Sequence, residues 1–94
     1  MVVSLVSVGQ LVSSNAGRDK KKLFLVFDIP NESFVRIVDG DTRKIDNPKK
    51  KNIKHLICYQ IISGELAEKF QKGTRVSNAD IRKAIQEIGE LPQS

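Results

Sequence analysis

The sequence is poor in the residues that build disulfide frameworks, metal centres and catalytic sites. Its 94 residues include one cysteine, Cys58, and one histidine, His55, so no internal disulfide can form and no tetrahedral zinc site can be completed. No serine, cysteine or acid is placed to form a catalytic triad with His55. We therefore expect a non-enzymatic protein that needs no metal and no other cofactor and resides in a reducing cytoplasm.

Long apolar runs and aromatic side chains are also scarce. Residues 1–12 are apolar, but polar side chains interrupt them, no basic segment precedes them, and they are too short to cross a bilayer. Tryptophan is absent, and the aromatic side chains are Phe24, Phe27, Phe34, Tyr59 and Phe70. A chain of this length has a small core, and we assign Phe24, Phe27 and Phe34 to the core of a β-barrel. We expect a monomer when the protein is free, with no membrane association.

Positive charge is in excess, and it is unevenly placed. Residues 1–62 hold eleven Lys and Arg against six Asp and Glu, whereas residues 63–94 hold five of each. The net charge of +5 therefore comes entirely from the first two thirds of the chain. A local positive field of this kind attracts a polyanion, of which nucleic acid is the commonest, although a solvated lysine-rich surface is the alternative interpretation.

Turn chemistry divides residues 1–62 into segments typical of short β-strands. Asp39-Gly40 indicates a tight turn between strands rather than a calcium loop, because no further carboxylates follow at calcium-loop spacing. Five antiparallel strands are expected, at residues 10–14, 23–29, 34–38, 43–46 and within 53–62. Strands this short with turns this frequent favour a small closed or partly open barrel.

The last third of the chain changes to a helical period. Ser63 and Gly73 are a candidate N-cap and C-cap around an apolar helix face. Ser77, followed three residues later by Asp80, predicts the start of a second helix, in which apolar side chains recur at helical spacing. We therefore predict a mainly β chain that ends in two short α-helices.

The most distinctive segments lie in residues 9–56. They read GQLV at 9–12, AGRDK at 16–20, VDGDTRK at 38–44 and NPKKKNIKHL at 47–56, with VSNADIRKA at 76–84 in the tail. These segments resemble the KOW-domain RNA-binding proteins of Firmicutes-type bacteria, which in turn are similar to a KOW-class large-subunit ribosomal protein of archaea and eukaryotes. Lys21 departs from the pattern, because the family usually has a second glycine in the first loop.

The resemblance implies an SH3-like barrel at residues 1–62 that binds structured RNA through its loops, and a helical extension at residues 63–94. It implies a protein of the ribosome and of translation, with ribosomal RNA as its partner and ribosomal proteins as further neighbours. The alternative is a protein-interaction module of a transcription or translation complex that uses the barrel or the helical tail. Basic loops in place of an exposed apolar groove favour RNA.

Two basic clusters are the predicted RNA-binding residues. In the first, Asp19 is expected to orient Arg18, the best candidate for bidentate phosphate binding or base stacking, while Gly17 lets backbone N–H groups approach phosphate oxygens. The first cluster comprises Gly17, Arg18, Lys20, Lys21 and Lys22, and the second comprises Arg43, Lys44, Lys49, Lys50, Lys51, Lys54 and His55. We expect both clusters to face one RNA surface.

Overall fold

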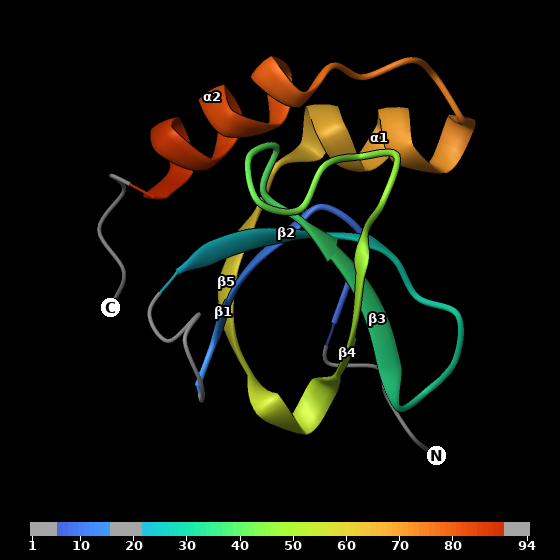
Figure 1. Cartoon of the computed structure of the whole chain (residues 1–94), viewed down its shortest axis with the longest axis vertical. Helices are drawn as coiled ribbons and strands as arrows, with labels where there is room; N and C mark the ends of the chain where they lie inside the picture. The colour runs from blue at the N-terminus through green and yellow to red at the C-terminus, as the bar shows by residue number, and fades with distance from the viewer. Residues whose placement is uncertain (1–5, 16–21, 90–94) are drawn as a thin grey trace.

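Five strands precede two helices along the chain. The computed structural model describes residues 6–15 and 22–89. The strands are β1 (Gln10–Ser14), β2 (Leu23–Asp28), β3 (Phe34–Val38), β4 (Lys49–Asn52) and β5 (Leu56–Ile62), and a 3₁₀ helix, η1 (Ile53–His55), joins β4 to β5. The helices are α1 (Gly64–Lys72) and α2 (Asn78–Gly89). Figure 1 shows both helices on one side of the sheet, with η1 at the opposite end of the molecule.

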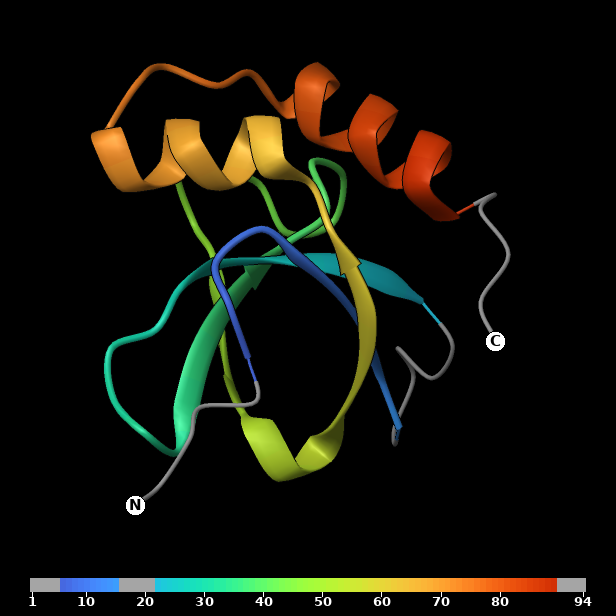
Figure 2. The same cartoon turned by 180° about the vertical axis from the view of Figure 1, so that it is seen from behind.

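The strands form one antiparallel sheet in the order β4-β3-β2-β1-β5. The sheet curves in the manner of a small SH3-like barrel, as Figures 1 and 2 show from opposite sides. The barrel stays open, because β4 and β5 occupy the two ends of the strand order in the described part of the chain. The predicted fold class, a small antiparallel barrel followed by two helices, is confirmed.

Alternating side chains of the central strands fill two separate cores. Inside the barrel, Val12, Phe24, Val26, Val35 and Ile37 are fully buried. Successive side chains of a strand point to opposite faces, so the neighbours of these residues point outward. Each fully buried side chain of this size stabilises the fold by about 1.5–3 kcal/mol, which makes this cluster the main support of the barrel.

The second core lies between the outer face of the sheet and the two helices. Leu11, Leu25 and Val38 are fully buried there, against Leu66 of α1 and Ile81 of α2. Figure 2 shows the helices lying over β2, on the side of the sheet away from the barrel interior. The helical extension therefore packs on the barrel and covers outward apolar side chains that would otherwise meet water.

The helix ends form as the sequence predicts. The Ser63 hydroxyl accepts a hydrogen bond from Leu66 N–H (3.4 Å), and Gly73 ends α1 with φ of +70°. Asp80 N–H donates to the Ser77 hydroxyl (3.1 Å), and Ser77 N–H donates to the Asp80 carboxylate (3.2 Å). This reciprocal pair is a capping box, and its hydrogen bonds lower the pKa of Asp80.

The predictions for the connection between β3 and β4 are wrong. Residues 43–46 form turns instead of a strand, and the fourth strand is Lys49–Asn52. Asp39-Gly40 opens a connection that spans residues 39–48 rather than a tight hairpin turn. An edge strand needs backbone hydrogen bonds to only one neighbour and tolerates charged side chains, so β4 lacks the apolar pattern by which strands are recognised.

The assignment of Phe27 and Phe34 to the barrel core is also wrong. Phe34 is half-buried on the outer face of the sheet, where Lys50 Nζ lies 4.6 Å from the centre of its ring. It faces outward because the next residue, Val35, points into the barrel. Phe24 does lie in the barrel core, and Phe27 packs against the core beneath the helices.

We predict that Gly40→Ala destabilises the protein more than Gly73→Ala does. Both glycines have positive φ, +75° and +70°, so either alanine costs about 1–2 kcal/mol of backbone strain. A Cβ at Gly40 would also overlap the carbonyl oxygen of Asn78 on α2, whereas a Cβ at Gly73 would enter open space. Chemical denaturation should give a loss for Gly40→Ala at least about 1 kcal/mol larger. Equal losses would show that α2 is not held against this connection.

Candidate nucleic-acid interface

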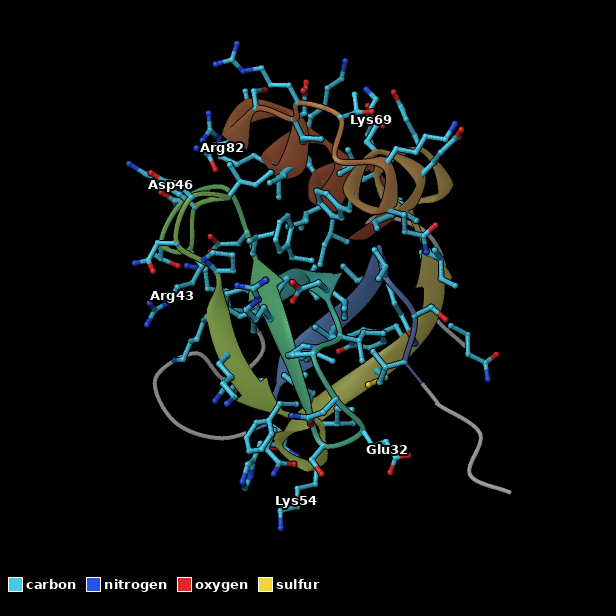
Figure 3. All side chains as sticks on the ribbon, turned by 90° about the vertical axis from the view of Figure 1, so that its right-hand side faces the viewer. Glu32, Arg43, Asp46, Lys54, Lys69 and Arg82 are labelled. Carbon is cyan, nitrogen blue, oxygen red and sulfur yellow. The ribbon has the colours of Figure 1, made fainter. Side chains whose placement is uncertain are left out.

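The second predicted cluster forms one strip along the β4 edge of the barrel. We call this strip the basic flank, and it comprises Arg43, Lys44, Lys49, Lys50, Lys51, Lys54 and His55. Its first two residues precede β4, its three central lysines lie on β4, and its last two are exposed on η1. Figure 3 shows Arg43 beside β4 and Lys54 at the end of the barrel away from the helices. The structure thus brings this cluster together.

The basic flank carries a clear excess of positive charge. Residues 43–55 contain six Lys and Arg and one carboxylate, Asp46, which gives a net charge of +5. In the described ranges 6–15 and 22–89, no carboxylate pairs with Lys50, Lys51 or Lys54. Their field is therefore available to an anionic partner.

Alternate side chains of β4 point to opposite faces of the sheet, so its lysines lie on both faces. Lys50 lies opposite Arg36 on the outer face, whereas Lys49 and Lys51 lie opposite residues of β3 that point into the barrel. Ile53 N–H donates to the carbonyl oxygen of Ser33, the residue before β3 (2.9 Å). Hydrogen-bonded and non-hydrogen-bonded pairs alternate along an antiparallel ladder, so the Lys50 N–H and C=O point away from β3. A polyanion that follows this edge would have cations on either side and a backbone donor between them.

Four cations elsewhere on the described surface have acidic partners. Lys22 Nζ lies 2.9 Å from the Asp39 carboxylate, and Arg36 pairs with Asp28. The α1 lysines pair with glutamates one turn before them, in the pairs Glu65–Lys69 (3.3 Å) and Glu68–Lys72 (2.6 Å). In each pair the carboxylate cancels part of the electrostatic field of the cation. These four cations therefore differ from Lys50, Lys51 and Lys54 of the basic flank.

The first predicted cluster lies mostly outside the described residues. Gly17, Arg18, Lys20 and Lys21 fall in that part, as does Asp19. Lys22 is described, and its ammonium group also donates to the Thr42 hydroxyl at 2.7 Å. This bond places Lys22 next to the start of the basic flank, although its ion pair with Asp39 reduces the charge it offers to phosphate. Its assignment as a phosphate contact stays a prediction.

Asp39 organises the connection that carries Arg43 and Lys44. Its buried carboxylate accepts hydrogen bonds from the N–H groups of Asp41 (2.9 Å) and Arg43 (2.7 Å), and from the Thr42 hydroxyl (2.7 Å). Burial by itself would raise the pKa of Asp39, but these bonds and the Lys22 ammonium outweigh it and lower the pKa to about 2. The ionised carboxylate therefore holds the turn together.

Helix α2 also fixes the connection between β3 and β4, through side-chain hydrogen bonds to its backbone. Asn78 Oδ1 accepts a hydrogen bond from Ile45 N–H (2.9 Å), and the Arg82 guanidinium donates to the Gly40 carbonyl oxygen (2.5 Å). Asp39, Asn78 and Arg82 are positioning residues that sequence patterns alone did not reveal. The Asp39-Gly40 signal indicates a turn, but contacts between residues about forty positions apart leave no local signal in a single sequence.

Three further observations bear on the site. No helix in the described parts of the chain is long and apolar enough to cross a membrane. Among the described residues, no three His, Cys, Asp or Glu side chains gather as a metal site would require. Cys58 packs against the barrel core, and burial raises the pKa of its thiol, which lowers the fraction of reactive thiolate at neutral pH.

Comparison with known proteins finds a relative in Bacillus subtilis. No protein-family model matches the chain. The chain is 37% identical over 71 residues to a Bacillus subtilis (strain 168) protein named "Putative ribosome-binding protein YbzG". The aligned region covers 76% of this chain and 96% of the relative, so it extends over nearly the whole of the shorter protein.

We predict that Asp39→Asn lowers the free energy of unfolding by about 2 kcal/mol at pH 7. The folded-state pKa of about 2 lies below the usual value of 3.8, so the ionised carboxylate stabilises the fold. This stabilisation is present above pH 4 and is lost as the pH falls from about 4 to 2. The difference between wild type and variant, measured by denaturation at several pH values, should shrink over that interval. A difference that stays constant down to pH 2, or that Asp41→Asn reproduces, would contradict this role.

Proposed function

We propose that this chain, which belongs to the same family as YbzG of Bacillus subtilis, is a cytoplasmic ribosome-associated protein that binds structured RNA through its basic flank. The name of the relative supports association with the ribosome. The chemistry of the flank supports RNA, and ribosomal RNA in particular, as the ribosomal component that it contacts. The proposal assigns no catalytic step to the chain.

The observation that carries the proposal is the excess of positive charge on one edge of the barrel. The net charge of residues 43–55 equals that of the whole chain, +5, because positive and negative charges cancel over the remaining residues. Lysine side chains are long and bind phosphate as mobile point charges, so a strip of them can follow an irregular RNA backbone. Binding of this kind releases condensed counterions and depends steeply on salt concentration.

Protection of an edge strand is the competing explanation for lysines on β4. Charged side chains on an edge prevent it from pairing with another sheet. The cations continue past the strand in both directions, however, with Arg43 and Lys44 before it and Lys54 after it. Those residues do not lie on an exposed strand, so protection of the edge does not account for them.

We predict that the double variant Lys50→Gln/Lys54→Gln weakens RNA binding between roughly 10- and 100-fold in 0.1 M salt. It should also make the log–log salt slope shallower by roughly 2, because two phosphate contacts are lost. Fluorescence anisotropy with a structured RNA hairpin measures both quantities. Co-sedimentation with Bacillus subtilis ribosomes should fall in parallel.

The matched control is Lys72→Gln/Lys83→Gln, which removes two exposed cations from the helices. It changes the net charge equally and should leave the salt slope within about 0.5 of the wild-type value. Equal losses in the two double variants would mean that only total charge matters and would contradict the assignment to the flank. Ribosome co-sedimentation that persists in Lys50→Gln/Lys54→Gln would point to contact with a ribosomal protein instead.

A further inference from the structure

The structure contains a hollow where the helical extension meets the sheet. It has a volume of about 320 Å³, at the lower end of the range for ligand pockets. Its apolar walls are Phe27 of β2, Ile45 of the connection before β4, Phe70 of α1 and Val76 between the helices, and Thr74 and Arg75 also line it. We call it the aromatic hollow.

We propose that the aromatic hollow binds one unpaired nucleobase of the RNA that the basic flank holds. The inference rests on the proposed function and adds a second component to it. The flank supplies phosphate contacts that do not depend on sequence, whereas the hollow would select RNA in which a base is free of its stack.

The walls of the aromatic hollow suit a flat, polarisable ring. The Phe27 and Phe70 rings meet edge to face, with centroids 5.2 Å apart and an interplanar angle of 67°. Both rings are only half-buried, so part of their surface remains open. The Arg36 guanidinium lies 5.7 Å from the centre of the Phe27 ring. Aromatic rings and guanidinium planes are the surfaces on which proteins stack unpaired bases.

The charges around the aromatic hollow also favour a nucleotide. Arg75 lines it, as does Lys69, which is ion-paired with Glu65 (3.3 Å), and no Asp or Glu lines it in the part of the chain that the structure describes. A smaller hollow between the two helices, of about 160 Å³, is lined by three acids, Glu65, Asp80 and Glu87, and by two cations, Lys69 and Lys83, so acids outnumber cations there. The balance of charge therefore favours an RNA phosphate at the first hollow over the second.

The aromatic hollow is continuous with the basic flank. Ile45 follows Lys44 directly in sequence, and Asn78 of α2 holds its backbone in place through the 2.9 Å hydrogen bond described above. Figure 3 labels Lys69 in the helical layer and Arg43 of the flank below it. An RNA strand that lies along β4 and the connection before it would reach the opening past Lys44, and Asp46 is the one carboxylate among residues 43–55.

The test uses three RNA hairpins that differ at one position. The first is fully paired, the second has a single bulged adenosine, and the third has an abasic nucleotide in place of that adenosine. Wild-type protein should bind the bulged hairpin about tenfold more tightly than the abasic one, because only the base differs between them. Equal affinity for these two hairpins would overturn the inference.

Phe70→Leu tests which surface holds the base. This variant keeps an apolar side chain but removes one aromatic wall, and it should reduce the tenfold ratio to about one while leaving affinity for the paired hairpin unchanged. The matched control is Phe24→Leu, the same substitution in the barrel core, which should keep the ratio. A ratio that survives Phe70→Leu, or that Phe24→Leu abolishes equally, would count against the hollow.

Failure of this inference can be told apart from failure of the proposed function. If the function is correct, Lys50→Gln/Lys54→Gln lowers affinity for all three hairpins by the same factor, whether or not the hollow holds a base. An NMR titration with adenosine 5′-monophosphate tests the hollow without the flank. The methyl signals of Ile45 and Val76 should shift, whereas those of Val12 inside the barrel should not. Unshifted Ile45 and Val76 signals would overturn the inference even if the lysine variants behave as predicted.

Discussion

Burial of apolar side chains on both faces of one small sheet is the constraint on which the rest of the structure depends. Adjacent residues of the central strands point to opposite sides, with Leu11 and Val12 on β1 and Leu25 and Val26 on β2 all fully buried. The curved sheet covers its own inner face, but its outer face needs a second layer. Helices α1 and α2 supply that layer, so they belong to the same folding unit as the barrel.

The helices cover only part of the outer face of the sheet, and this determines which side chains remain available for binding. The helices cover Leu11, Leu25 and Val38 and leave the half of the outer face that carries Phe34, Arg36 and Lys50 uncovered. Where the layer ends, it contacts the connection between β3 and β4 and creates the aromatic hollow. The contacts that stabilise the fold therefore also position the first residues of the basic flank. Substitutions that change how the helices pack on the sheet should therefore also change the positions of Arg43 and Lys44.

Much of the fold can be predicted from the sequence where local chemistry determines it. β1, β2 and β3 have apolar residues and flanking turns, and the caps at Ser63, Gly73 and Ser77 use side chains close in sequence. β4 could not be predicted, because a strand of lysines and asparagine at the edge of a sheet has no apolar pattern.

The candidate site shows the same division between local and long-range effects. All residues of the basic flank lie within one short segment, residues 43–55, so they could be grouped from the sequence alone. The Lys22–Asp39 ion pair and the meeting of Phe27 with Phe70 join distant residues, and only packing brings them together. Residues 16–21 carry the rest of the predicted RNA contacts and lie outside the described part of the chain.

Site-specific photocrosslinking on the ribosome tests the central claim most directly. A photoreactive amino acid placed at Lys50 or Lys54 of the full chain, followed by sequencing of the crosslinked RNA, identifies what the flank contacts. The account predicts crosslinks to a defined segment of ribosomal RNA from both positions and far fewer from the same probe at Lys83 on the exposed side of α2. Crosslinks to ribosomal RNA from Lys83 alone, or to protein alone from Lys50 and Lys54, would contradict it.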